Sequence, residues 1–66
     1  METIQLTIPT MKSHHCQMTV THAVQRTGAS VKNIEPTKAV IEIPDTLTRQ
    51  AVLEAVEQAG YKVQAN

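Results

Sequence analysis

The chain has 66 residues, and its six basic residues balance its six acidic ones at a formal net charge of +0. A chain of this length can bury one small core, so we expect a single domain over residues 1–66. The neutral charge predicts no electrostatic attraction to nucleic acid or to an anionic membrane surface.

The cellular setting follows from the apolar runs and the cysteine count. No apolar run is long enough to span a bilayer, and the start Met-Glu-Thr-Ile lacks the basic and apolar regions of a secretory signal. The single cysteine, Cys16, excludes an internal disulfide and a structural zinc site built from two or more cysteines. We therefore expect a reduced, cytoplasmic setting and no direct membrane insertion.

Residues 3–9 predict the first strand. Ile4, Leu6 and Ile8 alternate with polar residues, which is the period-two pattern of a strand with one buried face. Pro9 has no backbone N–H to donate, so the strand is expected to end there.

A helix is predicted after the short polar segment over residues 10–15. From Cys16 onward, apolar or small residues such as Val20 and Val24 recur at helical spacing and define one inward-facing stripe. Gly28 predicts the C-terminal end of this helix, because glycine readily adopts the left-handed conformation found there.

The remaining strands are shorter or weaker. Residues 31–35 predict a second strand, which Pro36 ends. Residues 39–43 alternate cleanly and predict a third strand, and residues 61–63 predict a short last one.

A second helix is predicted between the third and fourth strands. It opens after Pro44, with Asp45 or Thr46 as the N-cap, because these side chains accept hydrogen bonds from the first free amides of a helix. Val52 and Val56 form its inward stripe.

The order strand, helix, strand, strand, helix, strand is that of the split βαβ motif. We therefore predict an α+β, ferredoxin-like βαββαβ sandwich with a four-stranded antiparallel sheet and two helices on one face. The first and third strands alternate most cleanly, so they are expected in the middle of the sheet. The other two carry polar residues that suit edge strands.

The segment from Met11 to Cys16 is where metal chemistry is expected. Cys16 would sit at a helix N-terminus, where the helix dipole and free amides favour the thiolate. His14 and His15 precede it, and thiolate with imidazole suits Cu(I) or Zn(II). Ser13, three residues before Cys16, is a good N-cap.

Two segments carry a resemblance to a known family. Residues 11–20 read Met-Lys-Ser-His-His-Cys-Gln-Met-Thr-Val, and residues 55–61 read Ala-Val-Glu-Gln-Ala-Gly-Tyr. The first is similar to the Met-x-Cys-x-His-Cys loop of bacterial heavy-metal-associated domains, with Ser13 in place of the first metal-binding cysteine. The second is similar to their Ala-Ile-Glu-x-Ala-Gly-Tyr ending. The chain thus resembles, over nearly its whole length, the heavy-metal-associated domains of copper chaperones and metal-pumping ATPases.

The resemblance implies a domain that binds and transfers a heavy-metal ion, either as a free copper chaperone or as a module of a larger transporter. It implies Cu(I) as the ion, and a metal-transporting P-type ATPase or another metal-handling protein as the partner. It also implies that Met11 packs beneath the loop and that Tyr61 lies near it and shields it. Since the hydroxyl of Ser13 is a poor ligand for a soft ion, we expect weaker Cu(I) binding than in a two-cysteine relative. A greater tolerance of Zn(II) or another transition metal should accompany it.

The predicted metal ligands are Cys16 and at least one of His15 and His14. Neighbours on a regular helix rarely aim at one ion, so a His15–Cys16 chelate needs an irregular loop. His14 and Cys16 converge more readily if the loop is still turning there. Two chains could instead each donate Cys16 to one ion, which would give a metal-bridged homodimer. The alternative is a degenerate scaffold that acts as a protein-interaction or regulatory module without metal.

Other proteins with this topology have functions that need residues which this chain lacks. RNA recognition needs aromatic residues on the two central strands, and these strands have none. An acylphosphatase-like loop needs an arginine, whereas this loop has only Lys12. A Cys-His enzyme needs an imidazole held across from the thiol by a third group, so we predict no enzyme. Met18 is expected to fill a gap in the core, and His22 to be solvated.

Overall fold

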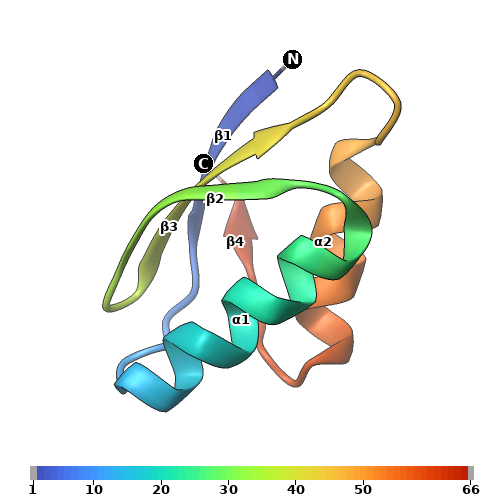
Figure 1. The fold of residues 1–66 in the computed structure, drawn as a ribbon. Helices are drawn as coiled ribbons and strands as arrows, with labels where there is room; N and C mark the ends of the chain where they lie inside the picture. The colour runs from blue at the N-terminus through green and yellow to red at the C-terminus, as the bar shows by residue number, and fades with distance from the viewer. Residues whose placement is uncertain (1, 66) are drawn as a thin grey trace.

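Three strands of six residues each form the body of an antiparallel sheet. The computed structural model describes residues 2–65 and orders the strands as β2 (Ser30–Glu35), β3 (Lys38–Ile43), β1 (Glu2–Thr7) and β4 (Gln64–Ala65) (Figure 1). β1 pairs with β3 along its whole length, so that Ile4 lies opposite Ile41. The two strands with the cleanest alternation are therefore at the centre, as predicted.

Two helices cover one face of this sheet, α1 (His14–Thr27) after β1 and α2 (Arg49–Gln58) after β3 (Figure 1). Alternate residues point to this face, and the buried ones are aliphatic: Ile4 and Leu6 in β1, and Ala39, Ile41 and Ile43 in β3. Sheet and helices share one core of buried residues: Ile4, Leu6, Ile8, Met11, Val20, Val24, Ala29, Ala39, Ile41, Ile43, Val52 and Val56. Within residues 2–65 neither helix is long and apolar enough to cross a membrane. The α+β arrangement of two helices on an antiparallel sheet is confirmed.

α1 begins two residues earlier than the apolar pattern predicted. Its N-cap is Ser13, with extended backbone angles (φ −89°, ψ 162°), and the helix already includes His14 and His15. An apolar stripe detects only buried turns, and the first turn of α1 is exposed up to the half-buried Cys16. Gly28 ends the helix at a φ of 103°, as predicted.

α2 begins later than predicted, because its N-cap is Thr48 and not Asp45 or Thr46. The Thr48 side chain accepts a hydrogen bond from a backbone amide of the first helical turn. The preceding residues form a turn instead, in which the amide of Leu47 donates to the carbonyl of Pro44 (3.0 Å). Leu47 packs against the core, which fixes this turn in place.

The last strand is shorter than predicted and lies further along the chain. Residues 61–63 belong to no strand, although Tyr61 and Val63 pack against the core. β4 follows at Gln64–Ala65 and pairs only with the end of β1. Among residues 2–65 the sheet thus has three full strands and a two-residue fourth, where a short fourth strand over residues 61–63 was expected.

Candidate metal-binding site at the start of α1

The loop between β1 and α1 is fixed to the turn between β2 and β3. The amide of Ile8 donates to the carbonyl of Thr37 (2.7 Å), and the amide of Thr37 donates to the carbonyl of Met11 (2.7 Å). Thr37 makes both bonds with a φ of 69°, a conformation that β-branched residues rarely adopt. Met11 is completely buried beneath the loop, so its thioether belongs to the core and cannot reach an exposed ion.

Ser13 connects the start of α1 to the thiol of Cys16. Its Oγ accepts a hydrogen bond from the amide of Cys16 (3.2 Å) and donates one to the Sγ of the same residue (3.2 Å). One hydroxyl therefore caps the helix and contacts the candidate ligand. The N-cap prediction for Ser13 is confirmed, whereas its bond to the thiol was not predicted.

The half-buried Cys16 thiol lies among hydrogen-bond donors that favour its ionised form. The hydroxyl of Ser13 contributes most, and the hydroxyl of Tyr61 follows. Together they lower the pKa of the Cys16 thiol below its ordinary value. The backbone amides of Ser13 and Lys12 act in the same direction, and partial desolvation opposes them. The thiolate is the form that binds metal, so the site favours the reactive state.

Tyr61 reaches this site from the end of α2. Gly60 turns the chain with a φ of 99°, and the amide of Tyr61 donates to the carbonyl of Val56 (3.4 Å). The hydrogen bond to Cys16 raises the pKa of the Tyr61 hydroxyl, as do burial and the thiolate charge, while Thr19 has the opposite effect. The phenol therefore stays protonated and remains a donor to the thiolate.

The two histidines stand on the first turn of α1, both exposed. Consecutive helical residues are rotated by about 100°, so His15 points about 100° and His14 about 200° away from Cys16. The irregular loop that a His15–Cys16 chelate needs is absent, and so is the turning loop in which His14 and Cys16 would converge, because the helix has already begun at His14. Residues 2–65 contain no group of three or more His, Cys, Asp and Glu side chains placed to hold a metal ion.

Comparison with known proteins identifies the family. The sequence matches no family model and no curated protein. Among solved structures, the copper chaperone Atx1 from Synechocystis PCC6803, in a trimeric form, is 34% identical with a TM-score of 0.74. The match covers 92% of this chain and 98% of that one. The chain belongs to the heavy-metal-associated domain family.

Two further solved structures share the fold of this heavy-metal-associated domain. A protein solved in a study of crosstalk between Cu(I) and Zn(II) homeostasis has a TM-score of 0.85 at 26% identity, over 100% of both chains. A copper-binding domain of the P-type ATPase HMA7 has a TM-score of 0.81 at 22% identity, over 100% of this chain and 95% of that one. The second match shows the fold alone.

The hydrogen-bonded contact of Ser13, Cys16 and Tyr61 was only partly visible in the sequence of this heavy-metal-associated domain. The resemblance placed Tyr61 near the loop, which its contact with Cys16 confirms. The serine–thiol bond is set by the helical register, which begins at the N-cap Ser13, whereas the amide of Lys12 belongs to the preceding loop. The three-residue spacing from Ser13 to Cys16 is the only sequence signal of that bond, since a cap hydroxyl reaches the third helical residue.

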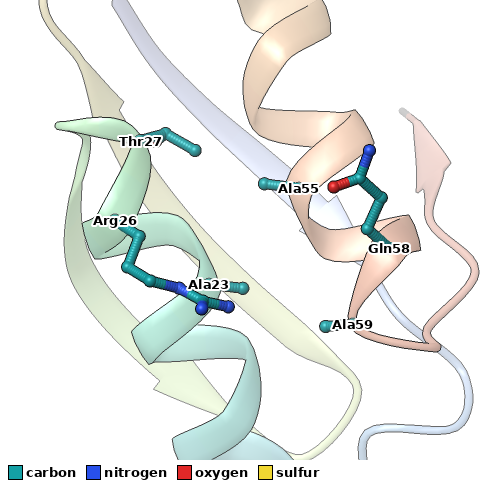
Figure 2. A pocket seen from close by; sticks show the side chains of 6 residues that line it. All are labelled: Ala23, Arg26, Thr27, Ala55, Gln58 and Ala59. Atoms are coloured by element: carbon teal, nitrogen blue, oxygen red, sulfur yellow. The ribbon is translucent and has the colours of Figure 1, made fainter.

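The groove between the two helices is a separate feature. It is a hollow of about 340 Å³ lined by small residues and by two longer polar ones: Ala23, Arg26, Thr27, Ala55, Gln58 and Ala59 (Figure 2). Figure 2 shows Arg26 on α1 and Gln58 on α2, the two longer side chains that line this hollow. It contains no thiol, imidazole or carboxylate, and its α1 residues belong to the second half of that helix. We do not assign the metal chemistry to it.

Proposed function

We propose that this heavy-metal-associated domain binds a transition-metal ion, Cu(I) before others, with the thiolate of Cys16 as the anchoring ligand. It would then transfer the ion to a partner protein. The observation that carries this proposal is the thiol environment of Cys16, at the start of α1. Four donors (the hydroxyls of Ser13 and Tyr61, and the amides of Lys12 and Ser13) lower the thiol pKa and favour the metal-binding form. Cu(I) is a soft ion and selects thiolate over harder ligands.

The second ligand comes from an imidazole or from a second chain. Of the two histidines, His15 is rotated by about 100° from Cys16 and His14 by about 200°, so His15 is the nearer in direction and His14 is the alternative. Because neighbours on a regular helix rarely aim at one ion, chelation within one chain requires the first turn of α1 to open. Where neither reaches the ion, two chains each give one Cys16 and form a metal-bridged homodimer. In each of these arrangements the ion has few ligands, so a thiolate of a partner protein can bind to it.

The same hydrogen bonds would ease release of the ion. In a transfer step, a thiolate of the partner binds the ion while the bond between the ion and the Sγ of Cys16 breaks. The hydroxyls of Ser13 and Tyr61 then stabilise the thiolate that is left behind. A metal-transporting P-type ATPase, or another metal-handling protein, is the proposed recipient. Only the bonds between the ion and its ligands change in this exchange, so the domain is proposed as a carrier and not as an enzyme.

The test is an anaerobic titration of the reduced protein with Cu(I) and with Zn(II), followed by native mass spectrometry. We expect tight Cu(I) binding that Cys16→Ser abolishes and that His15→Ala weakens. The matched control is Gln25→Ala, because Gln25 is an exposed polar residue near the other end of α1. This change should leave metal binding unchanged. One ion per chain supports a Cys-His site, and one ion per two chains supports the bridged dimer. Binding to Cys16→Ser as tight as to the unchanged protein would refute the proposal.

A second function has a specific observation in its favour. Ser13 is fully engaged as a helix cap, and residues 2–65 hold no ready group of three ligands. A degenerate domain that keeps only the scaffold, and that interacts with or regulates another protein, would look the same in these two respects. If neither ion binds above the background of the exposed histidines, this function replaces the first.

A further inference from the structure

The solvent-facing side of α1 carries a stripe of three potential ligands, His14, Met18 and His22. They follow one another at intervals of four residues, so each is rotated by only about 40° from the last. The buried residues Val20 and Val24 lie on the opposite side of the helix. Side chains four residues apart on one face come within about 5–6 Å at their Cβ atoms.

Met18 lies outside the buried core. Its side chain is 42% exposed, and it is the one large hydrophobic residue among residues 2–65 that is classed as exposed. The prediction that Met18 fills a gap in the core is therefore wrong. Met11 is the packed methionine near this site, at 0% exposure. A thioether held at the surface is available to a soft metal ion.

The imidazoles on either side of Met18 are equally available. His14 and His22 are exposed, and neither ring has a hydrogen-bond or ion-pair partner among residues 2–65. Helical side chains lean toward the N-terminus, so Met18 leans over the turn of His14, and His22 leans over the turn of Met18. His14 and His22 are about 12 Å apart along the axis, so an ion would bind Met18 with one of them at a time.

The local charge favours a monovalent ion. α1 contains no aspartate or glutamate, and its N-terminal end carries the positive end of the helix dipole. Imidazole and thioether are neutral ligands, so nothing on this face offsets a second positive charge. Cu(I) has a single charge and accepts both sulfur and imidazole ligands, whereas Zn(II) would meet stronger repulsion.

We propose that Met18 and the imidazole of His14 or His22 form a second, weaker Cu(I) site on the exposed face of α1. This site lies beside the Cys16 site and shares no thiolate with it. It goes beyond the proposed function, because it needs neither Cys16 nor a second chain. It would hold Cu(I) within one or two helical turns of the Cys16 thiol.

The experiment uses the Cys16→Ser protein, which removes the thiolate and leaves this face intact. Cu(I) is added anaerobically, and the methionine methyl groups are followed by ¹H–¹³C NMR. We expect the methyl resonance of Met18 to shift and that of buried Met11 to stay in place. Met18→Leu in this background should weaken Cu(I) binding at least about tenfold, since loss even of groups that only support a ligand costs that much. Met11→Leu is the matched control and should leave the affinity unchanged.

The two histidines give a second readout. Either single change, His14→Ala or His22→Ala, should leave a weakened site, and the double change should abolish it. Equal affinity of Cys16→Ser and Cys16→Ser/Met18→Leu, or an unmoved Met18 methyl resonance, would overturn this inference. The proposal for the Cys16 site is tested by a different comparison: it fails if the unchanged protein and Cys16→Ser bind Cu(I) equally tightly. Either proposal can therefore fail while the other stands.

Discussion

Replacing Ser13 by alanine should weaken both the helix and the reactivity of the thiol. The hydroxyl accepts a hydrogen bond from the third amide of α1 and donates one to the Sγ of Cys16, both at 3.2 Å. Loss of a serine N-cap costs about 1 kcal/mol, within a range of about 0.5–2 kcal/mol. In a domain of this size that amounts to a fall in Tm of about 4–8 °C. Such a loss is a large share of a total stability of about 3–10 kcal/mol for 66 residues.

The effect on the thiol has a definite sign. Ser13 is the main cause of the lowered pKa of Cys16, so Ser13→Ala should raise that pKa and slow alkylation at neutral pH. The pH profile of the alkylation rate should move to higher pH. Because the pKa of the Cys16 thiol is lower in the folded than in the unfolded protein, its ionisation stabilises the fold. This stabilisation is complete at a pH above the unfolded-state pKa, and it is lost as the pH falls through the folded-state pKa. The stability deficit of Ser13→Ala should therefore be larger in alkaline than in neutral solution.

Thr48 provides the matched control, because its side chain caps α2 through a hydrogen bond to the amide of Ala51, also at 3.2 Å. Thr48→Ala should lower the Tm by a similar amount and leave the alkylation profile of Cys16 where it was. Thermal unfolding followed by circular dichroism and iodoacetamide kinetics between pH 6 and pH 10 measure the two effects. The reasoning is refuted if Ser13→Ala leaves the profile unmoved, or if Thr48→Ala shifts it equally.

Three further changes test the site and the core. Tyr61→Phe removes the second hydrogen-bond donor to the Cys16 thiolate, so it should raise the thiol pKa and slow alkylation of Cys16 at neutral pH. An unchanged alkylation rate would show that the Tyr61 hydroxyl does not donate to the thiolate in solution. Ser13→Cys restores a second thiolate and should tighten Cu(I) binding at least about tenfold, measured by competition with a chelator, and unaltered affinity would count against a site in this loop. Leu6→Ala empties a position that is 2% exposed and should cost about 3–5 kcal/mol, leaving much of the chain unfolded in a thermal melt; a loss below about 1 kcal/mol would contradict the assigned core.

The sequence by itself determined the order of the elements and most of the core. Alternation in residues 3–9 and 39–43 marks strands because the side-chain period of a strand is two, whatever the strand pairs with. Gly28 and Ser13 mark the ends of α1 through local chemistry, a left-handed backbone and a hydroxyl that accepts an amide hydrogen bond. The family was readable from the loop and the Gly-Tyr ending, because those motifs are contiguous. Cys16 was the central candidate for a metal ligand because it is the one cysteine in the sequence.

The tertiary structure decided what surrounds that thiol. Tyr61 lies 45 positions beyond Cys16 in the chain, and only the packing of α2 on the sheet brings its hydroxyl close enough to lower the pKa of the Cys16 thiol. The start of α1 at His14 spreads the two histidines around the helix, which no apolar pattern could reveal because the first turn buries so little. Burial alone distinguishes Met11 from Met18. Local preferences fix where helices and strands begin and end, whereas long-range contacts fix which side chains meet. The chemistry of the Cys16 site depends on the long-range contacts.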